Sequence, residues 1–587
     1  MVKQLMKSIR EFKLATILTP TFVVGEVIIE ALIPFLISLL INDIKAGCDL
    51  SVILGYAWKL VILSLLSLLC GYLAGIYCAE ASTGFAKNLR YDIFSNIQKF
   101  SFSNIDKFSS ASLVTRLTTD IQNVQMAFMM IIRTAVRAPL NLIFSFTMAY
   151  IMGGSMAVIF LIIIPFLGIG LYLIVRTVMP VFKKGFPLFD KITRIVEENV
   201  KGIRVVKSFV REDYEIDKFD ETSNDIRKMF THAEQIIALN NPLMQISIYA
   251  VMLFVLMFGS EMIIKTNGTS LDVGQLSTLM TYGFQIMVSL MMLSMVFVMI
   301  TFSEESCKRI VEVLNEKSSI TSKENAITEV KDGSIDFDHV RFKYSPTAER
   351  PVLENIDVHI KSGETIGIIG GTGSAKSSFV QLIPRLYDVT EGTVRVGKED
   401  VRDYDLVTLR DSVAMVLQKN VLFSGTIADN IRWGNKDATL EEVKHVCHLA
   451  CADEFIEQMP DGYDTWIEQG GTNVSGGQKQ RLCIARALLK QPKILIMDDS
   501  TSAVDAKTDA IIRKAMKEYI PETTKIIIAQ RTSSVEDADR IIVLDGGKID
   551  AIGTSEDLLK TNQIYREVYL SQNKQGTEEI VEEGGVR

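Results

Sequence analysis

Six apolar runs, each long enough to cross a lipid bilayer, dominate the first half of the 587-residue chain. A span needs about 20 mostly apolar residues folded as a helix, because lipid offers no hydrogen-bond partner to open backbone groups. The runs lie at about residues 15–41, 54–79, 128–152, 155–178, 243–265 and 273–301. We therefore predict an all-α domain with six spanning helices, and the lipid bilayer is its first partner.

The distribution of Lys and Arg predicts the orientation of these spans. These residues gather before the first run and in the long connections after the second and fourth runs, whereas the other connections are short. Cytoplasmic segments carry such an excess. We expect a multi-pass protein of the cytoplasmic (inner) membrane with both termini in the cytosol. The long connections have a helical pattern and turning points near Phe102–Leu113 and Val206–Tyr214. They are either solvated loops or levers that meet a cytosolic domain.

Two carboxylates, Glu26 and Glu30, lie one helical turn apart within the first run. Ionisable groups at membrane depth are costly and usually face a cavity or a partner. Contact with a substrate or proton, a helix–helix hydrogen bond and a position near the aqueous rim all remain open. The sixth run is rich in methionine, a flexible side chain that suits a promiscuous apolar cavity and is also ordinary lipid-facing filler.

The composition changes after the sixth run, where a polar linker leads into a sequence of alternating strands and helices. We expect a transmembrane domain over residues 1–310, a linker over 311–333, an α/β domain over 334–575 and an acidic tail over 576–587. Strands are predicted at Ser334–Phe337, Thr365–Ile369, Val413–Leu417, Ile494–Met497, Lys525–Ala529 and Arg540–Leu544. The net charge of −8 gives no argument for a nucleic-acid partner.

A glycine-rich segment follows the predicted strand Thr365–Ile369 and precedes an apolar helical run. It consists of Gly370, Gly371, Thr372, Gly373, Ser374, Ala375, Lys376, Ser377 and Ser378. A strand, a glycine-rich turn and a helix form a phosphate-binding loop, in which a lysine reaches the phosphates and a hydroxyl ligates Mg²⁺. Lys376 and Ser377 have these two roles. Ala375 stands where the pattern has its second glycine, and we expect right-handed helical backbone angles there.

Further motifs lie on both sides of this segment and are given in chain order. They are the aromatic Tyr344, the segment Val416–Asn430 with Gln418, the string Asn473–Arg481 with Ser475, Gly476, Gly477 and Gln478, the strand Ile494–Met497 followed by Asp498 and Asp499, and Gln530 after another strand. With the six spans, the chain resembles a half-transporter of the ATP-binding cassette (ABC) exporter type. The resemblance implies a six-helix transmembrane domain followed by a P-loop ATPase domain with a helical subdomain.

The resemblance also implies roles for these residues. Tyr344 stacks on adenine, and residues 370–378 hold the phosphates of ATP. Ser377, Gln418 and Asp498 hold Mg²⁺. Ser475–Gln478 contact the nucleotide bound by a second half-transporter, which is the expected partner subunit. The function implied is ATP-driven export of a hydrophobic or amphipathic small molecule.

Besides Ala375, two catalytic positions depart from the family pattern. The residue after Asp498 is normally a glutamate that orients the attacking water, and here it is the shorter Asp499. Gln530 replaces the usual histidine. A general base works only within hydrogen-bond reach, and glutamine carries no proton. We therefore expect weak hydrolysis at this site and a heterodimer with a competent partner. The alternative is a homodimeric exporter of lipid or peptide.

Overall fold

The computed structural model describes residues 1–345, 348–500 and 504–572, and the predicted acidic tail over 576–587 lies outside these ranges. The chain forms two compact units. The first contains residues 1–98 and 109–316, and the second contains residues 99–108 and 317–587. The short segment 99–108 thus belongs with the α/β part of the chain, although the first unit surrounds it in sequence.

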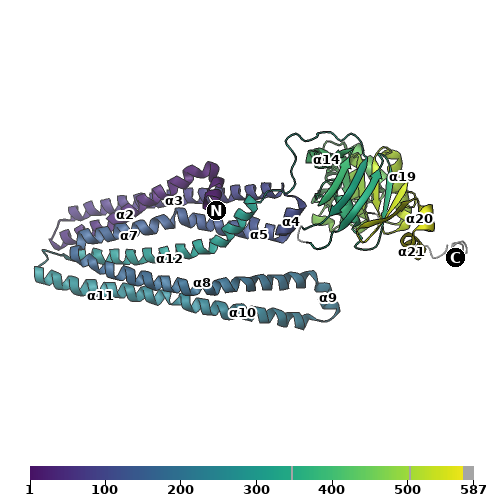
Figure 1. Cartoon of the computed structure of the whole chain (residues 1–587). Helices are drawn as coiled ribbons and strands as arrows, with labels where there is room; N and C mark the ends of the chain where they lie inside the picture. Colours follow the sequence, from purple (N-terminus) through teal and green to yellow (C-terminus); the bar gives the residue numbers. More distant parts are fainter. Residues whose placement is uncertain (346–347, 501–503, 573–587) are drawn as a thin grey trace. The chain divides into compact units, whose positions relative to one another are not determined.

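The first unit contains the six predicted spans as long helices (Figure 1). They are α2 (Lys13–Lys45), α3 (Leu50–Ile97), α7 (Thr134–Gly153), α8 (Val158–Lys201), α11 (Asn240–Thr266) and α12 (Val273–Asn315). Five helical stretches qualify as spans by length and hydropathy, because one of them, Ser110–Val181, holds both α7 and α8. Gly154, at φ +52°, breaks the helix between these two. Each of the six predicted runs thus lies in a long helix, while six separate crossings of the bilayer stay a prediction.

Several of these helices continue far beyond the length of a bilayer. Since an α-helix rises about 1.5 Å per residue, the 48 residues of α3 and the 44 of α8 extend well past about 30 Å of hydrocarbon. The second extension turns through α9 (Ile203–Ser208) and returns as α10 (Glu212–Ala238), which packs against α8. The predicted turning point near Val206–Tyr214 therefore lies between α9 and the start of α10.

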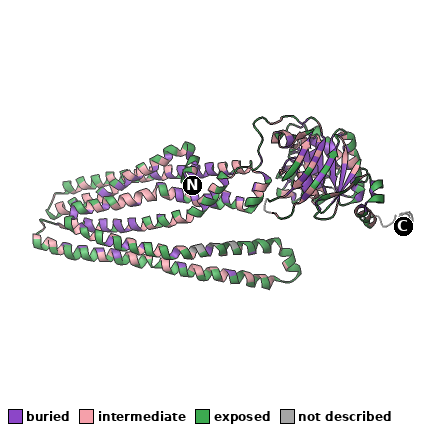
Figure 2. Ribbon diagram, in the orientation of Figure 1, coloured by how far each residue is buried: buried purple, intermediate pink, exposed green. Residues whose placement is uncertain are grey.

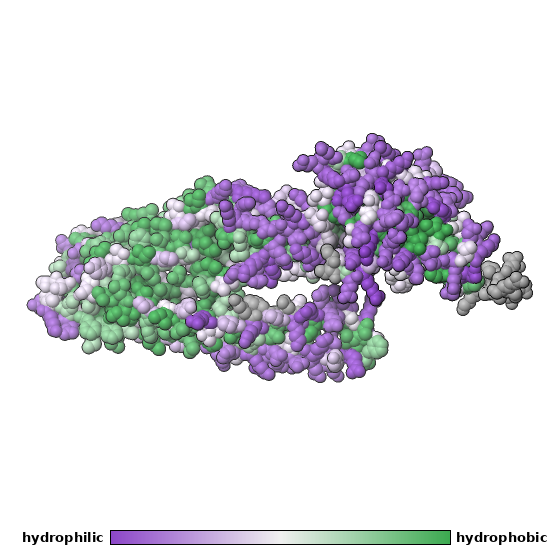
Figure 3. Space-filling model, viewed as in Figure 1, coloured by the Kyte–Doolittle hydropathy of each residue, from purple (hydrophilic) through white to green (hydrophobic). Residues whose placement is uncertain are grey.

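The remaining helices of the first unit are short. They are α1 (Val2–Leu5), η1 (Met6–Phe12), α5 (Ser110–Thr115), η2 (Arg116–Asp120), α6 (Ile121–Ile132) and η3 (Gly154–Ala157). The outward faces of the spanning helices are largely exposed (Figure 2), and the same helices carry a broad apolar surface (Figure 3). Exposed apolar side chains over such lengths are suited to lipid.

The two carboxylates of α2 pair with a single arginine of α7. Arg137 donates to Glu26 Oε1 at 3.0 Å and to Glu30 Oε1 at 2.6 Å. Gly71 of α3 lies against Glu26, since a Cβ on this glycine would meet Glu26 Oε1 at 2.9 Å. The interpretation as a helix–helix contact is confirmed, whereas contact with a substrate stays a prediction.

The second unit is built on a six-stranded sheet in the order β12-β11-β3-β10-β9-β6. Its strands are β3 (Thr365–Ile369), β6 (Val413–Val416), β9 (Ile494–Asp498), β10 (Thr524–Ile528), β11 (Arg540–Asp545) and β12 (Lys548–Gly553). All neighbours are parallel except β11 and β12. Every residue of β9 and β10 is buried, as expected of a sheet covered on both faces (Figure 2).

Two smaller sheets and a set of helices complete this unit. An antiparallel sheet has the order β2-β1-β4-β5, with β1 (Ile335–Phe342), β2 (Leu353–Ile360), β4 (Glu391–Val396) and β5 (Glu399–Asp400), and β7 (Gly425–Thr426) pairs with β8 (Trp466–Ile467). The helices are α4 (Phe102–Phe108), α13 (Lys376–Gln381), α14 (Leu406–Ser412), α15 (Ile427–Arg432), α16 (Leu440–Leu449), α17 (Asp453–Ile456), η4 (Gly462–Asp464), η5 (Gln469–Gly471), α18 (Gly476–Leu489), α19 (Ala506–Tyr519), η6 (Thr532–Ser534), α20 (Ser555–Thr561) and α21 (Gln563–Gln572). The predicted helical membrane domain followed by an α/β domain is confirmed.

Candidate functional site

The glycine-rich segment forms the turn between β3 and α13. Gly370 follows the buried strand directly, and a Cβ at this position would meet the carbonyl oxygen of Leu544 at 2.1 Å. Gly373 has φ +82°. Only glycine satisfies the first constraint without moving the backbone, and it satisfies the second at no steric cost. The segment Gly370–Ala375 therefore forms a tight loop that ends at the N-terminus of α13.

The expectation of right-handed backbone angles at Ala375 is wrong. This residue caps α13 with φ +71° and ψ +21°, in the left-handed region. The turn has not yet entered the helix at this position, so the backbone needs the conformation that glycine adopts most easily. A Cβ in this region costs roughly 1–2 kcal/mol. The loss of the second glycine is thus a strain built into the loop.

Lys376 and Ser377 lie at the start of α13 and face the loop and the neighbouring strand end. The ammonium group of Lys376 donates to the carbonyl oxygens of Gly370 and Gly371, both at 2.8 Å, and to Ser374 Oγ at 3.2 Å. Burial lowers its pKa, against the charges of Asp498 and Asp499. Burial also raises the pKa of Asp498, while a hydrogen bond from Ser377 lowers it. The hydroxyl and the carboxylate predicted to hold Mg²⁺ are therefore adjacent.

Four parallel strands bring the remaining predicted residues to one edge of the sheet. Because β3, β10, β9 and β6 are neighbours and parallel, the segments that follow them meet. Asp499 Oδ2 accepts a hydrogen bond from Gln530 Nε2 at 2.7 Å and another from Gln418 Nε2 at 3.3 Å. Asp499 itself has φ +49°. The structure thus joins Gln418, Asp499 and Gln530 in one cluster around a single carboxylate.

Tyr344 lies just after β1 and is 45% exposed, so its ring is open to a ligand. Its hydroxyl hydrogen-bonds with Ser378 Oγ at 2.8 Å and donates to Gln381 Oε1 at 3.3 Å. Both partners belong to α13, and Ser378 follows Ser377 directly. The predicted adenine-stacking ring is therefore tied to the helix that carries the phosphate-binding lysine.

The string Ser475–Gln478 begins a different helix, α18. Ser475 and Gln478 form a capping box, in which Gln478 N donates to Ser475 Oγ at 3.3 Å and Ser475 N donates to Gln478 Oε1 at 2.8 Å. Ser475 and Gly476 are exposed. A helix of 14 residues with an open, glycine-rich N-terminus favours an anion there. The segment predicted to contact the partner's nucleotide therefore begins a different helix from the one that carries Lys376.

The donor set fits a nucleoside triphosphate with Mg²⁺. The loop supplies backbone N–H groups beside Gly371 and Gly373, where a Cβ would meet no atom within 4 Å. Lys376 supplies a cation, and the pair Ser377 and Asp498 supplies the oxygen ligands that Mg²⁺ prefers. The exposed ring of Tyr344 supplies a stacking face.

Sequence reasoning missed Tyr387 and Arg137, which contact residues that it singled out, and Asp106, which contacts Tyr387. Tyr387 packs against Tyr344, with ring centroids 5.0 Å apart, and donates to Asp106 of α4 at 3.0 Å. Nothing in their spacing indicates this contact. Arg137 could have been found, because it is an ionisable residue within the third apolar run, as Glu26 and Glu30 are within the first.

Comparison with known proteins agrees with this architecture. Residues 16–302 match the ABC transporter transmembrane region, and residues 353–502 match the ABC transporter family. An uncharacterised ABC transporter ATP-binding protein of Bacillus subtilis is 34% identical over 554 residues, covering 94% of this chain and 96% of that protein. The ATP-dependent lipid A-core flippase of Photobacterium profundum is 30% identical over 521 residues, covering 86% and 88%. The solved structure of a bacterial Atm1-family ABC exporter with ATP bound has a TM-score of 0.83 at 24% identity, covering 97% and 99%.

Fold and comparisons define an ABC transporter chain whose membrane domain is fused ahead of its ATPase domain, with the fold of the solved Atm1-family protein. The chain belongs to the ABC transporter family. It is accordingly a multi-pass membrane protein of an ATP-hydrolysing class of transporters.

Replacing Ala375 by glycine should stabilise the ATPase domain. The exchange removes the left-handed strain but adds freedom to the unfolded chain, so we expect a net gain of about 0.5–1 kcal/mol. Thermal unfolding of the purified protein measures it. Ala510, exposed within α19, is the matched control, because glycine there should destabilise by about 1 kcal/mol. A loss of stability in A375G would contradict the interpretation that Ala375 is strained.

Proposed function

We propose that this chain is one half of a heterodimeric ABC exporter, and that its own ATP site hydrolyses slowly. The observation that carries the proposal is the pair of departures in one cluster, where Gln530 donates to Asp499 at 2.7 Å. The carboxylate of Asp499 is one methylene shorter than the usual glutamate and accepts hydrogen bonds from the side-chain amides of Gln530 and Gln418. Gln530 itself stands in place of a histidine, whose imidazole could be protonated. Such a cluster is suited to holding a nucleotide rather than to activating water.

Geometry and chemistry both weaken catalysis here. A general base must reach within about 3.2 Å of the proton that it abstracts, and aspartate is shorter than glutamate by about 1.5 Å. Asp499 Oδ2 is already the acceptor for Gln530 and Gln418. Gln530 can donate a hydrogen bond to a phosphate oxygen, but it cannot carry positive charge. The three side chains can orient a ligand while providing little base strength.

The segment Ser475–Gln478 retains the groups that would complete the ATP site of a catalytically competent partner subunit. Its serine, its glycines and its helix N-terminus are present and open. In the proposed assembly it completes the site on the partner subunit, while the partner completes the site on Gly370–Ser378. Each subunit would thus contribute to both sites, and only one site would turn over quickly.

Two exposed apolar features favour assembly with a second chain. At the end of the second extension of the first unit, the side chains of Phe209 and Val210 are 73% and 81% exposed. In the second unit, a groove of about 340 Å³ is lined by residues that include Val416, Leu417 and the stacked pair Phe423 and Trp433. Large apolar surfaces exposed to water commonly mark a site where another protein binds.

We propose that the long helical extensions of the first unit act as levers between the ATPase and membrane domains of the dimer.

The transported compound is proposed to be a hydrophobic or amphipathic small molecule. Methionine-rich surfaces repack around varied ligands, and α12 carries Met280, Met287, Met291, Met292, Met295 and Met299. The second candidate is a homodimeric exporter of lipid or peptide. The relative from Photobacterium profundum, named a lipid A-core flippase, favours the lipid version of this alternative.

ATP turnover by the chain alone and with its neighbour-encoded partner tests the heterodimer. We expect the chain alone to hydrolyse ATP slowly and the pair to be faster by roughly 10²-fold, the contribution of a positioned base. A panel of dyes and a labelled lipid, offered to vesicles holding each preparation, tests the cargo. If the chain alone hydrolysed ATP quickly, and D499N abolished that activity, the heterodimer proposal would be overturned and the homodimer favoured.

A further inference from the structure

The residues that surround the base-stacking ring form a continuous aromatic path to α4. Tyr387 meets Tyr344 edge to face, with ring centroids 5.0 Å apart at 87°, and lies 5.7 Å from Phe342. On its other side Tyr387 lies 6.0 Å from Phe102 of α4. Phe342 is buried and Tyr344 is half exposed. One face of the path is thus open to a ligand, and its far end is α4, which belongs to the same compact unit although it is distant in sequence from the ATPase domain.

A polar contact fixes the α4 end of this path. Tyr387 donates its phenolic hydroxyl to Asp106 Oδ2 at 3.0 Å. Burial raises the pKa of Tyr387, and the bond to Asp106 raises it further, so the hydroxyl stays protonated at neutral pH. The ring and the hydroxyl therefore hold α4 by two different contacts.

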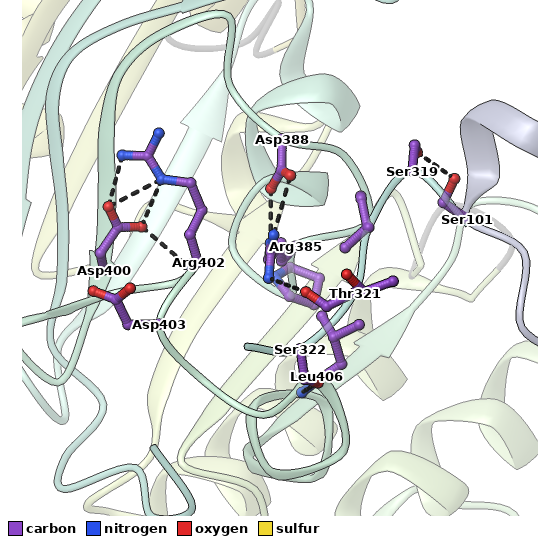
Figure 4. Close-up of polar contacts among 12 residues, drawn as sticks. Ser101, Ser319, Thr321, Ser322, Arg385, Asp388, Asp400, Arg402, Asp403 and Leu406 are labelled. Atoms are coloured by element: carbon purple, nitrogen blue, oxygen red, sulfur yellow. Dashed lines mark hydrogen bonds and ion pairs between the residues drawn. The ribbon is translucent and has the colours of Figure 1, made fainter. Parts of the chain in front are cut away.

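Neighbouring contacts hold both ends of this connection in place (Figure 4). Arg385 and Asp388 bracket Tyr387 in sequence, and Arg385 donates to Asp388 at 2.7 Å and to the carbonyl oxygen of Thr321 at 3.4 Å. Ser101, just before α4, hydrogen-bonds with Ser319 of the linker at 2.7 Å. All these residues belong to one compact unit. A displacement of Tyr387 would thus act on a helix that is already docked.

The opposite end of the path reaches the phosphate-binding helix. The hydroxyl of Tyr344 is bonded to Ser378 Oγ at 2.8 Å, two residues beyond Lys376 on α13. A base that stacks on Tyr344 covers the exposed face of the ring and restricts its motion. Because Tyr387 meets the Tyr344 ring edge to face, holding Tyr344 in place limits the positions that Tyr387 can take.

We infer that Tyr387 is a positioning residue that reports the base of the nucleotide, through Tyr344 and Asp106, to helix α4. Since α4 lies between α3 and α5 in sequence, a movement of α4 is passed along the chain to both of these helices. The nucleotide base thereby acts on the membrane domain independently of the phosphates. The inference rests on the proposed nucleotide site at Tyr344 and residues 370–378.

Hydrogen exchange of the full-length protein in lipid nanodiscs distinguishes the effect of the nucleotide base from the effect of the phosphates. The probes are Mg·ATP and Mg·tripolyphosphate, which has no base, at concentrations that protect residues 370–378 equally. We expect Mg·ATP to slow exchange over residues 99–108 by roughly threefold or more, and Mg·tripolyphosphate to leave it unchanged. Equal protection of residues 99–108 by both probes would overturn the relay.

Variants test the ring itself. Tyr387→Leu should abolish the effect of Mg·ATP on residues 99–108 while residues 370–378 stay protected, and Tyr387→Phe, which keeps the ring, should retain part of it. Tyr519→Leu, in α19, is the matched control and should behave as the wild type. An unaltered effect in Tyr387→Leu would overturn the relay. Should that variant fail to fold, the comparison of the two probes on the wild type still decides.

The same data separate this inference from the site on which it rests. If Mg·ATP fails to protect residues 370–378 of the wild type, both the nucleotide site and the relay are overturned. If residues 370–378 are protected without a difference between the probes at residues 99–108, the relay alone is overturned.

Discussion

Replacing Asp499 by glutamate should raise ATP hydrolysis at the site that we propose to be slow. The longer side chain brings the carboxylate nearer to the attacking water, and a positioned general base contributes roughly 10²–10⁴-fold. Because Gln530 remains in place of a histidine, we expect the lower end, a gain of roughly 10²-fold in kcat. The measurement is ATP turnover by the purified chain and by the assembled pair.

Two controls tie the gain to this site. Adding Lys376→Ala to the glutamate variant should remove the gained activity, because Lys376 belongs to the same phosphate-binding loop. Asp499→Asn should leave the slow wild-type rate within roughly threefold, since the native carboxylate supplies little base strength. The proposal of a slow site would fail if D499E showed no gain, or if D499N reduced the rate of the isolated chain by the full contribution of a base.

The sequence was sufficient for the features that depend on local pattern. Apolar runs of spanning length have one solution in lipid, so the six helices could be identified, although α3, α8 and α12 continue well past the apolar runs that predict them. Short apolar runs followed by glycine or acidic residues identified the parallel strands and placed Gln418, Asp498 and Gln530 at strand ends. The meeting of these residues follows from parallel topology, because the carboxyl ends of neighbouring strands lie at one edge.

Features that depend on backbone detail or on contacts distant in sequence could not be predicted in this way. The left-handed angles of Ala375 depend on where the turn ends and the helix begins, which the motif leaves open within one residue. Asp106 and Tyr387 are separated by 281 positions, and no periodicity connects them. The pairing of Arg137 with two carboxylates depends on how α2 packs against α7.

This last contact leads to a second large effect, on stability. Arg137 forms ion pairs with both Glu26 and Glu30, and Glu26 is buried. Replacing Arg137 by methionine keeps much of the length of the side chain but leaves two carboxylates together at membrane depth. Removing one partner of a buried pair costs about 3–5 kcal/mol. We expect Arg137→Met to lower the thermal stability of the protein in detergent by an amount near the lower value, because Glu30 and Arg137 remain partly exposed.

A compensating variant separates charge from packing. Changing Glu26 and Glu30 to glutamine together with Arg137→Met removes all three charges, and replacing a buried ionic cluster by neutral groups is often nearly neutral for stability. We expect this triple variant to recover most of the loss. Arg133→Met, one turn earlier on the same helical stretch, is the matched control and should change stability by less than about 1 kcal/mol. If the triple variant were as unstable as Arg137→Met, the loss would reflect packing of the arginine stem, and the charge argument would be wrong.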